Sequence, residues 1–207
     1  RPLVSVMLAQ NELGTLNPLA EISTVTKAHG ALLHSDAVAA FGKIPISVRQ
    51  LGVDLLTVSA HKIGGPAGTG ALIVRRNLKP AAFCLGGHQE QGRRPGTEAL
   101  PLVVGFGVAA QAVPQRVLAA AAAIELRTRL EALLLERVPG VLIAAATVPR
   151  LPNTVAAVFE DVIGVDVVGA CDTAGHAVAA GAACHSATGS PTTLARGLAE
   201  RFNQGLL

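Results

Sequence analysis

Apolar runs of strand length recur along the first third of the chain, separated by polar stretches or by segments with helical spacing. They are Leu3 to Ala9, Ala31 to His34, Asp54 to Ser59 and Gly70 to Val74. Short runs that are apolar on both faces and alternate with helices are typical of a mostly parallel sheet covered on both sides. We therefore expect an α/β fold with a mostly parallel sheet flanked by helices.

Two further stretches show helical periodicity. Apolar residues recur every three or four positions from Pro18 to His29, which predicts a helix that stops at Gly30. The same spacing predicts one long amphipathic helix from Pro114 to Arg137. Beyond it, we expect a small α+β domain built on two strand-like runs, Val141 to Ala145 and Thr154 to Phe159.

Composition excludes several classes of protein. The 207 residues are 50% hydrophobic and 15% charged, with a formal net charge of +3, which rules out a disordered tail, a coiled coil or a strongly basic arm. Five Phe without Tyr or Trp leave no platform for stacking bases, so we expect no nucleic-acid partner. The apolar stretch from Ala99 to Val113 is shorter than the ~20 residues of a membrane span. We expect no membrane association and a cytoplasmic protein.

Two features concern the chain as a whole. The cysteines, Cys84, Cys171 and Cys184, are odd in number, which argues against a disulfide scaffold and for reduced thiols. The first residue is Arg1 rather than Met, and an apolar run follows almost at once. We therefore expect the sequence to be a fragment of a longer protein.

A lysine and an acid each follow a predicted strand. Lys62 comes just after the run that ends at Ser59, and Asp36 ends the run Leu32-Leu33-His34-Ser35. Open α/β sheets bind ligands at the carboxyl ends of their strands. A lysine there can form a Schiff base with pyridoxal phosphate, while an aspartate can keep the pyridine nitrogen of that cofactor protonated. Two alternatives stay open: a solvated surface lysine, and an aspartate that caps a helix over Ala37 to Phe41.

The segment from Gly86 to Glu98 combines four glycines, two adjacent arginines and Thr97. Glycines let backbone N–H groups approach an anion, and arginines add charge-assisted donors. The pattern favours a phosphate cradle, with a plain exposed loop as the alternative.

Five ordered motifs carry a resemblance to a known family. They are Gln10-Asn11-Glu12-Leu13-Gly14-Thr15, His34-Ser35-Asp36-Ala37, Ser59-Ala60-His61-Lys62, Gly92-Arg93-Arg94-Pro95-Gly96-Thr97 and Gly181-Ala182-Ala183-Cys184-His185-Ser186. Together they resemble the cysteine desulfurases and selenocysteine lyases, in the class V branch of fold-type I pyridoxal phosphate enzymes. The resemblance implies a partial cofactor-binding large domain over residues 1–113, a connecting helix over 114–138, and a partial small domain with a catalytic cysteine loop over 139–207.

The resemblance also implies roles for individual residues. Lys62 is similar to the lysine that holds pyridoxal 5'-phosphate, and Asp36 to the partner of its ring nitrogen. The other cofactor contacts that it implies are Asn11 at the ring hydroxyl, Ser59 and His61 at the phosphate, and Thr97 at the phosphate of a neighbouring subunit. The last of these implies a homodimer.

Cys184 resembles the mobile catalytic cysteine of that family. Its thiolate would attack the sulfur of a cysteine substrate, release alanine and keep a persulfide for a sulfur acceptor such as an iron–sulfur assembly protein. The small residues around it suit a mobile loop, and His185 would favour the thiolate. The alternative is a buried cysteine that acts as a small hydrophobe, which is what we expect of Cys84 and Cys171.

Departures from the family pattern keep other functions open. Ala39 stands where the family has a glutamine that reaches the cofactor, and the family's upstream threonine loop and stacking histidine have no counterpart here. The arginine for the substrate carboxylate also has no clear counterpart near Arg201. The candidate functions are thus a cysteine desulfurase acting on L-cysteine, a selenocysteine lyase acting on L-selenocysteine, or an incompetent homologue that only binds or dimerises.

Two other site types find little support in the sequence. The glycine pattern from Gly105 to Ala110 matches a loose dinucleotide motif but is not followed by the strand and acid of a βαβ unit. The spacing of Cys171, His176, Cys184 and His185 fits no standard zinc site, so we expect no metal.

Overall fold

A computed structural model describes residues 1–181 of the chain. It divides into two compact units. Unit 1 comprises residues 1–8 and 17–120, and unit 2 comprises residues 9–16 and 121–207. The domain boundaries expected from the sequence stay a prediction.

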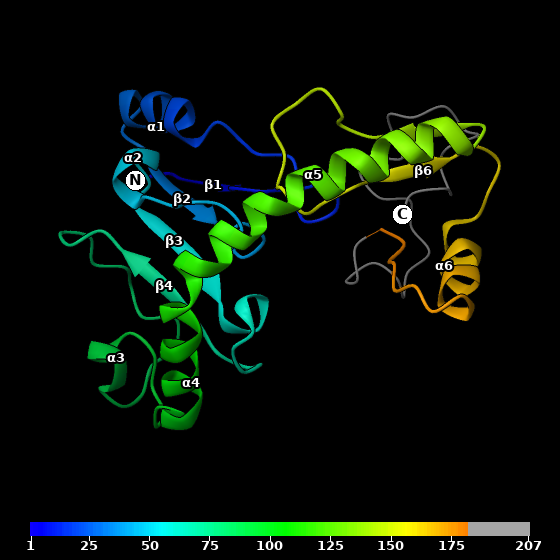
Figure 1. Ribbon diagram of the computed structural model, residues 1–207. Helices are drawn as coiled ribbons and strands as arrows, with labels where there is room; N and C mark the ends of the chain where they lie inside the picture. The colour runs from blue at the N-terminus through cyan, green and yellow to red at the C-terminus, as the bar shows by residue number, and fades with distance from the viewer. Residues whose placement is uncertain (182–207) are drawn as a thin grey trace. The chain divides into compact units, whose positions relative to one another are not determined.

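Unit 1 is built on a four-stranded mixed sheet in the order β1-β2-β3-β4, and Figure 1 shows its strands side by side. The strands are β1 (Leu3–Met7), β2 (Leu32–Asp36), β3 (Leu55–Ser59) and β4 (Gly70–Val74). The pairs β1–β2 and β2–β3 are parallel, whereas β4 runs antiparallel to β3. The mostly parallel α/β fold expected from the apolar runs is confirmed.

The helices agree with the periodicity in two cases. Helix α1 (Leu19–Ala28) ends before Gly30, whose φ of +65° is readily adopted by a glycine. Helix α5 (Val113–Arg137) is the long helix expected from the sequence. Shorter helical elements complete unit 1: α2 (Val48–Leu51), the 3-10 helix η1 (Ala60–Ile63), α3 (Gln89–Gly92) and α4 (Leu100–Gln111).

Among the described residues, no single helix is long and apolar enough to cross a membrane. Helices α4 and α5 meet those length and composition criteria only when taken together, and they are bent by 52° at their junction.

A buried carboxylate joins the starts of β2 and β3. Asp54 is 3% exposed, and its Oδ2 accepts a 2.9 Å hydrogen bond from the Leu33 N–H. In return, the Asp54 N–H donates to the Leu33 carbonyl at 2.8 Å. The Asp54 Oδ1 lies 2.7 Å from Nη1 of Arg75, which follows β4. Because a buried carboxylate needs such partners, these contacts tie three neighbouring strands together at one end of the sheet.

Unit 2 contains the antiparallel pair β5 (Val141–Ile143) and β6 (Ala157–Phe159), followed by α6 (Gly164–Thr173). The two strand-like runs predicted from the sequence are therefore present but shorter. Leu13, Ala144, Ala156 and Val158, the last of them in β6, form a small buried core.

An ion pair fixes the second half of α5 within unit 2. The Arg150 side chain is 4% exposed, and its Nη1 and Nη2 donate to the Glu131 carboxylate at 2.8 Å and 3.3 Å. One helical turn earlier, Arg127 Nη1 donates to the Leu151 carbonyl at 2.7 Å. These contacts hold α5 against the segment that leads to β6.

We expect Asp54→Ala to destabilise unit 1 more than Asp54→Asn. The alanine leaves the buried Leu33 N–H without an acceptor, which costs about 1–3 kcal/mol, whereas the asparagine keeps a carbonyl oxygen at that place. Chemical denaturation followed by circular dichroism measures both variants. Equal losses for the two would show that the hydrogen bond to Leu33 contributes nothing.

Candidate active site

The parallel pairing of β2 with β3 sets the position of the two central candidates. In the register of the sheet Asp36, the last residue of β2, lies opposite Thr57. Strand β3 ends two residues later at Ser59, and Lys62 follows within η1. Asp36 and the Lys62 segment therefore follow the same edge of the sheet, at the carboxyl ends of adjacent strands.

The Asp36 carboxylate has one oxygen engaged and one without a partner among residues 1–181. Its Oδ1 accepts a 2.8 Å hydrogen bond from the Val38 N–H. The segment after it forms consecutive tight turns, in which the Phe41 N–H donates to the Ala37 carbonyl at 2.8 Å. The α-helix considered for Ala37 to Phe41 does not form, although Asp36 does cap the turn. Its half-buried side chain keeps Oδ2 available for a ligand.

The segment that carries Lys62 has a fixed backbone. Helix η1 ends at Gly64 in a left-handed conformation, and the Gly65 N–H closes back on the Ala60 carbonyl at 2.9 Å. Ala60 and Ile63 are buried while Lys62 is exposed. The lysine thus projects from a short helical turn whose apolar side is anchored in unit 1.

The two residues expected at the phosphate lie beside one another. Ser59 Oγ is 2.7 Å from His61 Nδ1. The hydroxyl and the ring nitrogen form one hydrogen-bonding pair on the strand edge, with the role of each atom set by the histidine tautomer. This arrangement provides polar groups that suit an anion next to Lys62.

Helix α4 supports the Lys62 segment through glycines. A Cβ on Gly65 would come within 3.2 Å of the Ala109 Cβ, and one on Gly105 would come within 3.1 Å of Pro66. The backbones of α4 and residues 65–66 therefore approach closely. The glycine pattern from Gly105 to Ala110 lies inside this helix, so the dinucleotide-loop alternative is wrong.

A second lysine lies close to the first. Lys43 is half-buried at the end of the turns that follow β2, and its pKa is lowered below the ordinary lysine value, first by burial and then by the charge of Lys62. Sequence reasoning missed this residue, because a lysine after Phe41-Gly42 reads as an ordinary turn residue.

His34, which the sequence marks only as part of a motif, links three strands. Its Nδ1 lies 2.7 Å from Ser5 Oγ in β1, and its Nε2 lies 3.1 Å from Thr57 Oγ1 in β3. Because side chains alternate along a strand, His34 and Asp36 occupy the same face of β2. Ser5, His34 and Thr57 therefore form a hydrogen-bonded network on the face of the sheet that carries the Asp36 carboxylate.

The remaining candidates belong to other segments of the chain. Asn11 belongs to a turn of unit 2, in which Gln10 Oε1 accepts from the N–H groups of Glu12 and Leu13 at 2.7 Å and 2.6 Å. Thr97 is exposed in the loop before α4, and Cys184 lies outside the described residues. Within unit 1, no hydrogen bond among the described residues joins Thr97 to the Lys62 segment.

The loop expected to cradle a phosphate folds on itself. Within α3, Glu90 and Gln91 have φ values of +50° and +59°, so this is a left-handed turn rather than a regular helix. Gln89 Oε1 accepts from the Gly96 N–H at 3.3 Å, and Arg93 Nη1 donates to Gln91 Oε1 at 2.9 Å.

Cys84 is exposed, so the expectation that it is a buried hydrophobe is wrong, whereas Cys171 is half-buried. No group of three or more metal-ligating side chains gathers within residues 1–181.

Comparison with known proteins decides the family. The model of the family described as aminotransferase class-V matches residues 2–199. The chain belongs to the aminotransferase class-V family. Curated class-V relatives include a cysteine desulfurase of Enterobacter agglomerans, 42% identical over 95% of this chain and 49% of that protein. Another, from Gluconacetobacter diazotrophicus, is 40% identical with the same coverage.

Solved structures agree with this class-V assignment. A NifS-like protein from Rickettsia africae superposes with a TM-score of 0.85 at 32% identity, over 99% of this chain and 54% of that one. A structure described as SspA in complex with cysteine has a TM-score of 0.79 at 30% identity, over 99% of this chain and 57% of that one. The chain spans about half the length of the relatives that it matches.

The glycines of α4 provide a test of how the Lys62 segment is supported. We expect Gly105→Leu to destabilise unit 1 by about 1–3 kcal/mol, because its side chain would collide with Pro66. Gly107→Leu on the same helix is the matched control, since nothing lies within 4 Å of a Cβ at that position. Denaturant unfolding of both variants gives the comparison, and a Gly107→Leu loss as large as that of Gly105→Leu would contradict the close approach.

Proposed function

We propose that this chain carries the pyridoxal phosphate site of a cysteine desulfurase, which removes sulfur from L-cysteine. The observation that supports this most is that Asp36 and the Lys62 segment follow adjacent parallel strands at one edge of the sheet. The relatives named cysteine desulfurase support the substrate.

The residues at this edge fit the cofactor. Lys62 supplies an exposed amine for its aldehyde, and no carboxylate in residues 1–181 forms an ion pair with that amine. Asp36 supplies a carboxylate oxygen without a partner for the ring nitrogen, and Ser59 with His61 supplies polar groups for the phosphate. When bound, pyridoxal phosphate supplies an electron sink for bonds broken at the substrate's α- and β-carbons.

Each of the candidate residues has its own role around pyridoxal phosphate. Asp36 would keep the cofactor's ring nitrogen protonated, which would make the cofactor a stronger electron acceptor. Ser59 and His61 would hold the phosphate, and Asn11 the ring hydroxyl. Lys62 would be the amine that takes up and delivers protons near the substrate carbon.

Sulfur transfer is assigned to Cys184. Its thiolate forms a bond to the substrate sulfur while the carbon–sulfur bond breaks, and the electron pair of that bond stays with the carbon. Protonation of the carbon gives alanine, and the sulfur remains on Cys184 as a persulfide. A thiolate is needed because the neutral thiol is a poor nucleophile.

Partners follow from the same proposal. Thr97 would contact the cofactor phosphate of a second copy, which makes the protein a homodimer. The persulfide would be delivered to an acceptor protein, such as an iron–sulfur scaffold, in the cytoplasm.

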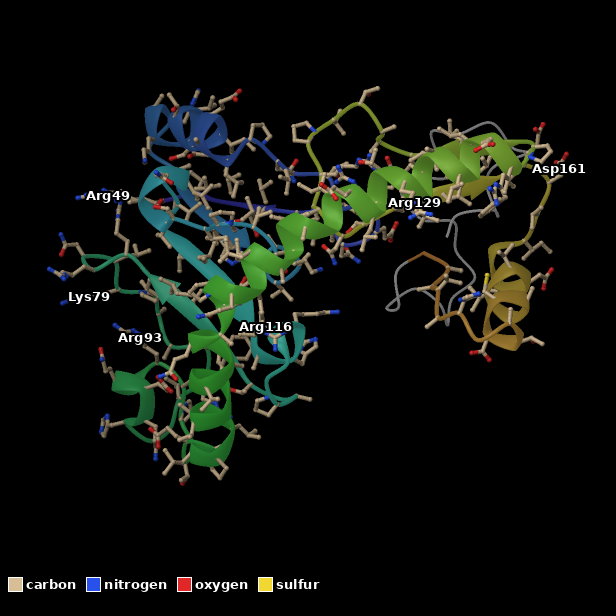
Figure 2. The ribbon with its side chains drawn as sticks, viewed as in Figure 1. Arg49, Lys79, Arg93, Arg116, Arg129 and Asp161 are labelled. Atoms are coloured by element: carbon tan, nitrogen blue, oxygen red, sulfur yellow. The ribbon has the colours of Figure 1, made fainter. Side chains whose placement is uncertain are left out.

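Replacing Lys62 tests cofactor attachment. We expect Lys62→Ala to abolish the covalent adduct that borohydride reduction traps between protein and pyridoxal phosphate, because no amine remains at that position. Mass spectrometry of the reduced protein measures the adduct. Lys79→Ala, at an exposed lysine after β4 (Figure 2), is the control and should keep it. An adduct that persists in Lys62→Ala would assign the wrong lysine.

Replacing Cys184 separates sulfur transfer from cofactor binding. We expect Cys184→Ser to retain the trapped adduct but to lower alanine release from L-cysteine by more than about a hundredfold, because loss of a nucleophile is among the costliest catalytic changes. Cys84→Ser, at the exposed thiol, should release alanine at the original rate. The role of Cys184 would be refuted by unchanged release in Cys184→Ser.

A further inference from the structure

Thr57 on β3 is the residue that the sheet places directly opposite Asp36. The two are partners in the parallel register of β2 and β3. The Thr57 carbonyl also accepts a 2.9 Å hydrogen bond from the N–H of Ala37, the residue after Asp36. Partners in a parallel register lie on one face of the sheet, and neighbouring strands are about 4.8 Å apart. A hydroxyl on Thr57 is therefore within reach of a carboxylate on Asp36.

The Thr57 hydroxyl is engaged with His34 instead. Its Oγ1 lies 3.1 Å from His34 Nε2 and 3.5 Å from the Ser35 carbonyl oxygen. On the other side of the imidazole ring, His34 Nδ1 lies 2.7 Å from Ser5 Oγ. No hydrogen bond within residues 1–181 joins the Thr57 hydroxyl to Asp36. The histidine thus holds the side chain that faces Asp36 across the strands.

The distances around the ring assign the direction of these hydrogen bonds. Hydroxyl groups donate to carbonyl oxygens at about 2.5–3.0 Å, so the Ser35 carbonyl at 3.5 Å is a poor acceptor for the single Thr57 proton. His34 Nε2 is the better acceptor. A neutral imidazole carries one proton, which then lies on Nδ1 and is donated to Ser5 Oγ. The ring accepts from β3 and donates to β1.

This arrangement matters for the second oxygen of Asp36. Its Oδ1 accepts from the Val38 N–H, while its Oδ2 has no partner among the described residues. A hydroxyl released from His34 would turn to another acceptor, and an ionised carboxylate is stronger than any neutral one on that face. A carboxylate that already accepts the Thr57 hydroxyl would bind a second donor less strongly.

We propose that His34 is a positioning residue of the candidate active site, which holds the Thr57 hydroxyl away from Asp36 so that Oδ2 stays free for the cofactor's ring nitrogen. His34 acts through Thr57, since no hydrogen bond in the described part of the chain joins its ring to Asp36. The inference rests on the proposed role of Asp36 and assigns a task to two residues outside the catalytic set.

The first measurement uses the cofactor-free chain and locates the proton on the His34 ring. Carbon and nitrogen chemical shifts distinguish the two neutral forms of an imidazole, and the signals of His34 are identified by their loss in His34→Gln. Under mildly alkaline conditions, in which imidazole rings are neutral, we expect the proton on Nδ1. A proton on Nε2 would overturn the inference, because the ring would then donate to Thr57 and leave the hydroxyl proton free.

The second measurement uses pyridoxine 5'-phosphate, which has the ring and phosphate of the cofactor but no aldehyde. Its affinity, followed by its own fluorescence, therefore reports ring contacts without a bond to Lys62. We expect His34→Phe, which keeps the size of the ring but offers no acceptor, to weaken binding by about 3- to 30-fold. His34→Gln, whose amide oxygen can accept the Thr57 hydroxyl, should bind more tightly than His34→Phe.

The double variant separates this role from packing. Thr57→Val breaks the same hydrogen bond to His34 but leaves no hydroxyl to turn, so it should bind more tightly than His34→Phe. His34→Phe combined with Thr57→Val should bind as Thr57→Val does, because removal of the hydroxyl removes the competitor. His29→Phe, at an exposed histidine that ends α1, is the control and should bind as the original chain does.

Two affinity results would overturn the inference in variants that circular dichroism shows to be folded. One is a double variant as weak as His34→Phe or weaker, since packing rather than the hydroxyl would then be responsible. The other is His34→Phe that binds as tightly as the original chain. If the original chain binds no pyridoxine 5'-phosphate, the proposed cofactor site fails together with this inference, whereas a His34 proton on Nε2 refutes the inference alone.

Discussion

The parallel pairing of β2 and β3 is the constraint on which the rest of unit 1 depends. Asp36 lies opposite Thr57 because the strands are in this register, and a slip of one residue would turn the Asp36 side chain to the other face of the sheet. At the amino ends of these strands, Asp54 exchanges hydrogen bonds with Leu33 and thereby fixes the same register. The buried Asp54 carboxylate at one end of the strands thus helps to fix the position of the Asp36 carboxylate at the other end.

Close backbone contacts also fix the position of the segment that follows β3. Gly42 lets the turn after β2 touch Ile63, while Gly65 and Gly105 let α4 lie against residues 65–66. Side chains larger than hydrogen at these positions would separate the elements. The backbone around Lys62 is therefore held from two sides, and the Lys62 side chain takes no part in these contacts. The Lys62 amine is thereby held on a fixed backbone at the edge of the sheet that also carries Asp36.

Much of the fold could be predicted because local patterns carried it. The four strand runs, the helix after Pro18 and the long helix to Arg137 each show the periodicity of their element. Helix α4 was not predicted, since Leu100–Gln111 is apolar on nearly every side and contains two glycines, which leaves no amphipathic period to detect. The association of residues 9–16 with unit 2 was also out of reach, because it depends on contacts such as Thr15 with Arg150, far apart in the sequence.

For the candidate site, the order of motifs identified Asp36, Lys62 and the Ser59–His61 pair, but not the groups around them. Lys43 and His34 interact with groups on other strands and turns, which only the tertiary structure brings together. We propose above all that Asp36 and Lys62 flank one cofactor ring. A crystal structure with pyridoxal phosphate tests it most directly: we predict electron density continuous with Lys62 Nζ and the Asp36 carboxylate within hydrogen-bond distance of the ring nitrogen. A cofactor bound elsewhere, or a ring nitrogen turned away from Asp36, would contradict the account.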